Sequence, residues 1–76
     1  MKELAEFIVG NIIDKKEFTV SELEDDGRLV IEIKVSPEVI GIVIGKGGNT
    51  IKAIQTLLRV KGRLQDKLVS VTITEN

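Results

Sequence analysis

The chain of 76 residues contains no cysteine and no histidine, and its only aromatic residues are two phenylalanines. Without cysteine there are no disulfides and no thiolate metal sites, which fits a reducing cytosol. Without histidine, histidine-based acid–base chemistry, Ser-His and Cys-His nucleophiles and the usual zinc sites are excluded. The sequence therefore predicts that the protein is not an enzyme. We expect no catalytic residue, no metal site, no cofactor and no small-molecule substrate.

A long hydrophobic run is also missing. The longest one, residues 39–45, has seven residues, whereas a membrane-spanning helix needs roughly 20. Residues 1–6 include acidic side chains, and no small-residue cleavage site follows an apolar stretch, so we expect no signal peptide. These absences predict a cytoplasmic protein without a membrane partner. The length predicts a single domain over residues 1–76.

The net charge of −1 hides an uneven distribution along the chain. Residues 1–33 carry four basic and nine acidic side chains, whereas residues 34–76 carry seven basic and three acidic ones. The second part can attract a polyanion, but the balance is not that of a strongly basic nucleic-acid-binding protein. We expect four basic residues of this part to form a solvated face that adds at most a diffuse attraction: Arg59, Lys61, Arg63 and Lys67.

Two segments have the pattern of a β-hairpin. Alternation of apolar and polar residues predicts strands over residues 17–23 and 28–35, joined by the strong turn signal Asp26-Gly27. Because Leu23 breaks the alternation, we expect the first strand to end or bulge near Glu22. The clean alternation of the second strand predicts an antiparallel sheet with one buried face.

The remaining segments have the pattern of helices and one more strand. Helices are predicted over residues 2–13, 37–44 and 49–61, the second of them with Ser36 as its N-cap. Gly41 inside that helix costs about 1 kcal/mol relative to alanine, so we expect a close packing contact there. Gly62 is expected just after the third helix, and residues 67–74 form the last strand. The order α-β-β-α-α-β predicts an α+β fold in which three helices cover one face of a three-stranded sheet.

The most specific feature is the glycine loop, residues 45–48, which reads Gly-Lys-Gly-Gly between two predicted helices. A glycine loop that leads into a helix can hold a phosphate, because the first N–H groups of a helix have no partner inside it. The ATP-binding loop requires a preceding strand and Ser or Thr after its lysine, where this chain has Gly47. The dinucleotide fingerprint requires glycine where this chain has Thr50, and also a βαβ unit. Both nucleotide-binding loops are therefore disfavoured.

Residues 43–54 instead resemble the signature of KH domains, V-I-G-x-x-G-x-x-I-x-x-I, at every specified position. The predicted order of elements is similar to the bacterial type II KH arrangement, since only one strand can follow the last helix. The small size resembles the KhpA family of short bacterial RNA-binding proteins. The resemblance covers the whole chain, and it implies that the glycine loop clamps the backbone of single-stranded RNA.

The resemblance also implies which residues bind RNA. The loop and the start of the following helix would hold phosphates through backbone N–H groups of residues 47–50 and through lysine side chains. Bases would lie in a groove between these helices and the strand at residues 28–35. The predicted RNA-binding residues are Ile33, Ile40, Val43, Ile44, Gly45, Lys46, Gly47, Gly48, Asn49, Thr50 and Lys52. The role of Lys52 stays open, because most helix lysines are simply solvated.

Phenylalanine is absent after Phe18, and Phe7 and Phe18 both fall at core-like positions. Base contacts would then lack stacking platforms, which predicts weak and loosely specific RNA binding by one domain. A second copy would raise the affinity through avidity. Ala53, Leu57 and Val60 form an apolar stripe that either packs under the first helix or pairs with another copy or another KH protein.

Two functions are compatible with these observations. The first is RNA binding through the glycine loop, as a post-transcriptional regulator or an RNA chaperone. The alternative is a protein-interaction module that dimerises with itself or another KH protein, with incidental affinity for RNA. Fold alone does not distinguish them.

Overall fold

The computed structural model describes residues 1–76, and its sheet is organised around strand β2 (Arg28–Val35). Alternate side chains of residues 29–35 are buried on one face of this strand, as the alternation predicts. Strand β1 (Phe18–Asp25) pairs with β2 in antiparallel orientation, and strand β3 (Leu68–Glu75) pairs with β2 in parallel orientation. The order in the sheet is β1-β2-β3, so that β1 and β3 are the edge strands.

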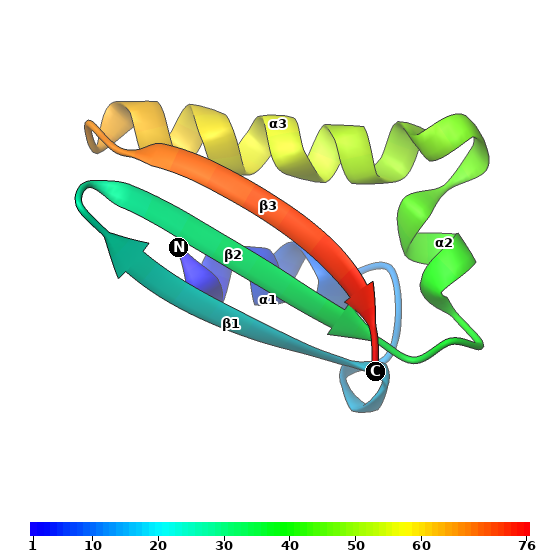
Figure 1. The fold of residues 1–76 in the computed structure, drawn as a ribbon. Coiled ribbons are helices and arrows are strands. Elements are labelled where there is room, and N and C mark those ends of the chain that lie inside the picture. The colour runs from blue at the N-terminus through cyan, green and yellow to red at the C-terminus, as the bar shows by residue number, and fades with distance from the viewer.

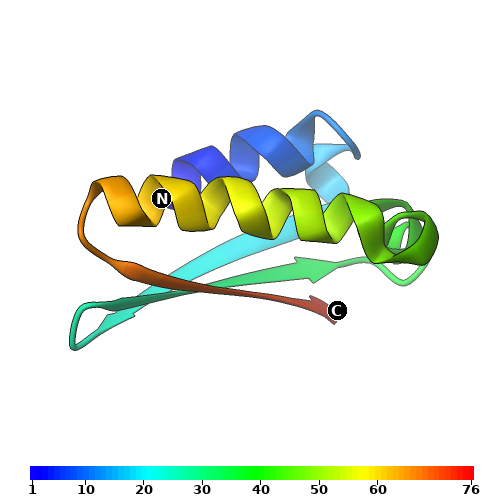
Figure 2. The same cartoon turned by 90° about the horizontal axis from the view of Figure 1, so that it is seen from above.

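The sheet is mixed, so the prediction of an antiparallel sheet is wrong for its third strand. Helices connect β2 to β3 and return the chain to the end of the sheet where β2 begins, as Figure 1 shows, so β3 runs in the direction of β2. The other face of the sheet has no helix on it (Figure 2). Because only one face of the sheet is covered, buried and exposed side chains alternate along the strands. The expectation of an antiparallel sheet rested on this alternation, which does not depend on strand direction here.

The hairpin turn forms at the predicted residues. Asp26 and Gly27 have φ values of 50° and 82°, which suit the type I′ turn favoured by Asp-Gly. Strand β1 continues in register with β2 to Asp25, so the predicted end or bulge near Glu22 is wrong. Leu23 lies on the open face of the sheet and is 65% exposed. Backbone pairing therefore continues β1 through Leu23 although the side chain of Leu23 is not buried.

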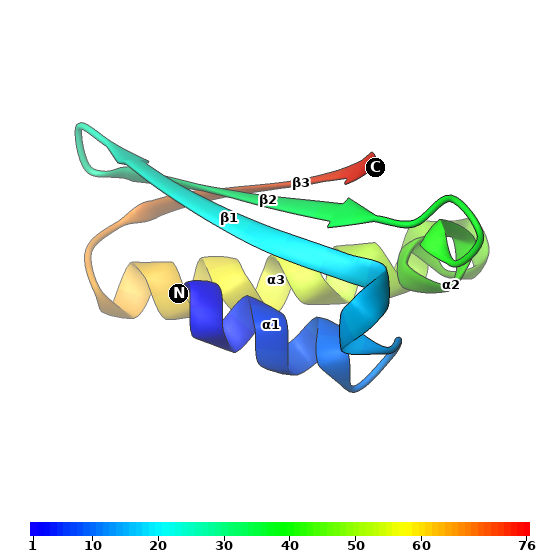
Figure 3. The ribbon, with the colours of Figure 1, turned by 90° about the horizontal axis from the view of Figure 1, so that it is seen from below.

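Helices lie on one side of the sheet (Figures 2 and 3). They are α1 (Lys2–Gly10), α2 (Ile40–Ile44) and α3 (Asn49–Leu64). Short 3-10 turns follow the first two, namely η1 (Lys15–Glu17) and η2 (Lys46–Gly48). The predicted α+β class, with three helices on one face of a three-stranded sheet, is confirmed.

Two helices are shorter than predicted because backbone carbonyl groups next to them accept hydrogen bonds from a side chain or within a turn. After α1, the Asn11 side-chain amide donates to the Phe7 carbonyl oxygen at 2.7 Å and replaces a helical hydrogen bond. Before α2, the Ser36 carbonyl oxygen accepts the Ile40 N–H at 3.1 Å. Residues 37–39 form a turn, and the N-cap of α2 is Val39 instead of Ser36.

Helix α3 is longer than predicted, because Gly62 lies inside it instead of after it. Gly62 is buried, and a Cβ atom there would collide with the Val69 side chain and lie 3.0 Å from the Lys67 carbonyl oxygen. Glycine at this position therefore allows the last turns of α3 to approach the beginning of β3 closely.

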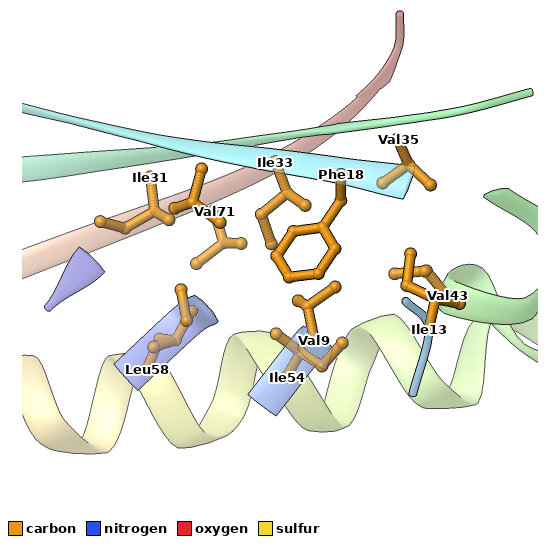
Figure 4. Close-up of a cluster of buried hydrophobic side chains, with 12 residues drawn as sticks. Val9, Ile13, Phe18, Ile31, Ile33, Val35, Val43, Ile54, Leu58 and Val71 are labelled. Atoms are coloured by element: carbon orange, nitrogen blue, oxygen red, sulfur yellow. The ribbon is translucent and has the colours of Figure 1, made fainter. Parts of the chain in front are cut away.

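The core lies between the sheet and the helices and is almost entirely aliphatic, as Figure 4 shows. Phe18 is buried in it, but Phe7 is 70% exposed, so the prediction that both phenylalanines are core residues is wrong for Phe7. The apolar stripe of α1 is wider than the face that meets the sheet, and Ala5 and Val9 alone are fully buried on that helix. The buried cluster consists of Ala5, Val9, Ile13, Phe18, Val20, Ile31, Ile33, Val35, Val43, Ile54, Leu58 and Val71.

Candidate nucleic-acid interface

The glycine loop links α2 to α3 through three glycines with positive φ values. Gly45 has φ 78° and ψ 167°, a region occupied almost only by glycine, and Gly47 and Gly48 have φ values of 66° and 76°. A Cβ atom on Gly45 would also collide with the Thr50 hydroxyl and lie 2.9 Å from the Thr50 backbone nitrogen. The backbone shape of the loop therefore requires glycine at Gly45, and Thr50 packs directly against it.

Two N–H groups expected to face phosphates are used within the loop. The Gly48 N–H donates to the Gly45 carbonyl oxygen at 3.0 Å, and the Asn49 N–H donates to the Lys46 carbonyl oxygen. These hydrogen bonds fix the turn that precedes α3. Anion binding by the backbone is thus left to the remaining donors of the loop and of the first turn of α3.

The charged side chains at this end are free. Lys46 and Lys52 are exposed and take part in none of the three ion pairs of the structure. Asn49 is exposed as well, and its side chain makes no hydrogen bond within the chain. Two lysines and an amide are therefore available around the loop for an anionic ligand.

The apolar residues predicted to line a groove divide into two groups. Ile40 and Ile44 are half-buried and reach the surface of α2. Val43 and Ile33 are fully buried, and Figure 4 places both in the core. They belong to the core and present no surface to a ligand.

Strand β3, not β2, borders α3. Strand β2 is paired along both of its sides, so β3 is the edge strand next to α3. Figure 1 shows β3 between β2 and α3, and the Gln55 side-chain amide donates to the Val71 carbonyl oxygen at 3.3 Å across this boundary. The sequence pattern did not reveal this arrangement because it depends on the direction in which β3 enters the sheet.

Two exposed residues of α2 beside the loop were missed by the sequence analysis. Ile42 is 56% exposed, and Gly41 has open space where its Cβ would stand. The expected packing contact at Gly41 is therefore absent. Gly41 itself was the sequence signal that this part of α2 is exposed. It lowers helix propensity but forms no turn and makes no packing contact within the chain.

The predicted apolar stripe of α3 is exposed, and its Leu57 and Val60 belong to a larger apolar face. Leu57 and Val60 are 54% and 50% exposed, and Ala53 is exposed too, so α1 does not cover the stripe. Between α1 and α3 lies an open hollow of about 310 Å³. This apolar face, as we call it, is lined by Leu4, Phe7, Ile8, Leu57, Val60, Lys61 and Leu64. The exposure of Phe7 and Leu64 on it was not predicted.

Comparison with known proteins decides the family. A model of the family described as KhpA/KhpB, KH domain, matches residues 2–73. The chain belongs to the KhpA/KhpB family of KH domains. This confirms the resemblance drawn from residues 43–54. Its curated relatives are named RNA-binding proteins, in agreement with the expectation that the protein is not an enzyme.

Several KhpA proteins are similar over nearly the full length. The chain is 42% identical over 74 residues to the RNA-binding protein KhpA of Clostridium perfringens, covering 96% of this chain and 99% of that protein. It is 36% identical over 76 residues to KhpA of Aquifex aeolicus, covering 99% and 96%. The match therefore includes both the glycine loop and the whole of the KH fold.

A solved structure has the same fold. The crystal structure of Era in complex with MgGDPNP and nucleotides of 16S ribosomal RNA aligns with a TM-score of 0.62 and 21% identity, over 97% of this chain and 29% of the Era chain. At this identity the comparison supports the KH-like fold alone.

In the KhpA-like chain itself, no helix has the length and apolar character needed to cross a membrane.

Proposed function

We propose that this protein binds single-stranded RNA by clamping its backbone at the glycine loop, and that residues 1–76 act as one domain in the bacterial cytoplasm. The observation that carries the proposal is the loop itself, in which three glycines with positive φ surround one exposed, unpaired lysine. Such a surface lets phosphates approach the backbone closely. The names of the relatives, RNA-binding protein KhpA, agree with it.

The residues around the loop have distinct roles in this proposal. Lys46 and Lys52 neutralise phosphates, and Asn49 and Thr50 at the start of α3 complete the phosphate contacts together with the glycines. Ile40 and Ile44 offer an apolar surface to bases. These contacts position a strand without reading its sequence, which suits a post-transcriptional regulator or an RNA chaperone that acts on many RNAs.

The decisive experiment is RNA binding by fluorescence anisotropy with the double variant K46D/G47D. Asp at position 47 is compatible with the fold, because Asp26 of the same chain adopts φ 50°. We expect binding to be lost, since the two new carboxylates repel phosphates. Lys16→Asp controls for the lysine-to-aspartate change elsewhere on the surface, because Lys16 is an exposed lysine in the other 3-10 turn, η1. Wild-type affinity in K46D/G47D, with an intact circular dichroism spectrum, would contradict the proposal.

We further propose that the apolar face pairs with a second copy of this chain. Six of its seven lining residues are apolar, and Lys61 is the one charged residue among them. In a two-fold interface each surface meets itself, so a nearly uncharged surface avoids repulsion between like charges. The pairing also supplies the second clamp that weak single-domain binding needs.

Light scattering after size exclusion tests the pairing. Leu57→Asp should convert a dimer to a monomer, while Leu23→Asp, at a leucine that is 65% exposed on the open face of the sheet, should leave the dimer intact. A wild-type monomer at high concentration would overturn the homodimer. A dimer that persists while K46D/G47D leaves RNA binding unchanged would favour the alternative function, a protein-interaction module with incidental RNA affinity.

A further inference from the structure

The end of α3 that lies farthest from the glycine loop carries a second concentration of positive charge. An open hollow of about 260 Å³ lies there beside the beginning of β3. Four of the seven residues that line it are basic and none is acidic. We call it the basic hollow, and its lining residues are Arg28, Arg59, Arg63, Lys67, Leu68, Val69 and Ser70.

The three arginines of the basic hollow have no partner within the chain. Lys67 forms an ion pair with Glu24, but no ion pair involves Arg28, Arg59 or Arg63. Arg59 and Arg63 are four residues apart on α3, so the two like charges face each other along the helix. An anion that binds between the guanidinium groups would offset this repulsion.

Packing of α3 against β3 brings these charges together. Gly62 lies between the two arginines of α3 in sequence, and the absence of a side chain there lets the helix approach Val69 and the carbonyl of Lys67. Arg28 joins from β2, where it stands opposite Leu68 in the register. Three separate segments of the chain thus converge on one hollow.

The size and charge of the hollow suit a phosphate group. Pockets that hold whole drug-sized ligands or cofactors have volumes of roughly 300–1,000 Å³, and the basic hollow is smaller than that. Its wall is rich in guanidinium groups, which bind phosphate oxygens in pairs. A phosphate on a longer chain is therefore a better ligand than an isolated nucleotide.

A polar stripe on α3 connects the glycine loop with the basic hollow. Lys52, Thr56, Arg59 and Arg63 follow one another at spacings of four, three and four residues and are all exposed, which places them on one face of the helix. This face is different from the apolar face. Along the helix axis, Arg59 and Arg63 lie about 15 and 21 Å from the first residue, Asn49, at 1.5 Å per residue. At about 3.4 Å per stacked nucleotide this separation corresponds to roughly four to six nucleotides.

We propose that the basic hollow is a second phosphate-binding site for the RNA strand held by the glycine loop. The strand runs along the polar stripe of α3, so one chain contacts more nucleotides than the four that the loop clamps. This inference rests on the proposed function, because it requires RNA at the loop.

Anisotropy with single-stranded RNAs of 5 and 12 nucleotides tests the inference. The shorter RNA fills the clamp alone, whereas the longer one reaches both sites. We expect the wild-type protein to bind the longer RNA at least tenfold more tightly. The variant R59Q/R63Q should lose this gain and bind the shorter RNA as before. Its slope of log affinity against log salt for the longer RNA should fall by about 1.4, corresponding to two phosphate contacts on a single strand.

The control variant is K15Q/K16Q, which removes the same charge from exposed lysines of η1. An equal loss of affinity in both double variants, or an equal loss for both RNA lengths, would overturn the second site and leave the clamp intact. Failure of the wild-type protein to bind either RNA would overturn the proposed function and this inference with it. The shorter RNA therefore distinguishes the two failures.

Discussion

The two ends of α3 present positive potential in different ways. At its N-terminal end the glycine loop depends on backbone shape, with three positive φ values and no ion pair. At its C-terminal end the basic hollow depends on side chains, with three unpaired arginines, two of which are on α3 where this helix packs closely on β3 at Gly62. The first end is sensitive to any change in dihedral angles. The second end is sensitive to charge and to the distance between helix and strand.

Glycines at the two ends illustrate this difference. Gly45 is needed for its conformation and for the space that Thr50 occupies, whereas Gly62 has ordinary helical geometry and is needed only for the space that Val69 occupies. Gly41, between β2 and the loop, meets neither requirement. Alanine at each of the three positions therefore tests a different effect: backbone conformation together with space at Gly45, space alone at Gly62, and helix propensity alone at Gly41.

The largest effect is expected from Gly45→Ala. The φ and ψ values of Gly45 cost an alanine about 1–3 kcal/mol, and the new methyl group also collides with Thr50. We expect a loss of unfolding free energy in that range or above and a loss of RNA binding at both RNA lengths. Urea denaturation and anisotropy measure the two. A loop that keeps its affinity with alanine at position 45 would show that backbone shape is not what makes the first end bind.

The next largest effect is expected from Gly62→Ala. Overpacking against Val69 costs about 1–3 kcal/mol and pushes the end of α3 away from β3. Denaturation should show the loss of stability, and only the longer RNA should bind more weakly. The double variant G62A/V69A should recover part of the stability, because the colliding Val69 methyl is removed. If the two RNA lengths lost affinity equally, the separation of the two ends would be contradicted.

Gly41→Ala is expected to act in the opposite direction. Gly41 has helical geometry and open space around its missing Cβ, so alanine should stabilise the protein by about 0.4–1 kcal/mol. Chemical denaturation measures the gain. A decrease in stability would mean that the packing around α2 is tighter than described. The RNA affinity of the same variant shows whether RNA contacts the exposed surface of α2 at Gly41.

The smallest effect is expected from Lys52→Gln on the polar stripe. Removal of one phosphate contact should lower the salt slope for single-stranded RNA by about 0.7. Lys16→Gln is the matched control, because Lys16 is an exposed lysine of η1 and lies neither on the stripe nor on the apolar face. Equal slopes for the two variants would show that position on the stripe does not matter.

Features encoded by neighbouring residues could be predicted from the sequence. The alternation of β2 and the Asp26-Gly27 turn are local, and both are found where they were predicted. The shape of the glycine loop could be predicted for the same reason, since its residues act through their own dihedral angles. The order of these local elements predicted the α+β fold, and the family signature identified it as a KH arrangement.

Features that depend on distant segments were predicted less well. Gly41 was expected in close packing and Gly62 just after a helix. Instead Gly62 packs closely inside α3 and Gly41 has open space beside it, because the position of β3 determines which glycine meets another segment. Phe7 was assigned to the core because helical spacing does not show how much of a helix the sheet can cover. The basic hollow was missed because its residues come from β2, α3 and β3 and are adjacent only in three dimensions.

The parallel pairing of β3 with β2 also has a consequence for the order of folding. Each residue of β3 pairs with a residue of β2 forty positions earlier in the chain, beginning with Leu68 and Arg28. Such non-local contacts form only after the entropy of closing a long connection has been lost, whereas the β1–β2 hairpin closes over two residues. The glycine loop lies within that long connection. We therefore expect its orientation toward the sheet to be established late in folding. An RNA that contacts both ends of α3, as proposed above, would then bind only chains that have completed the sheet.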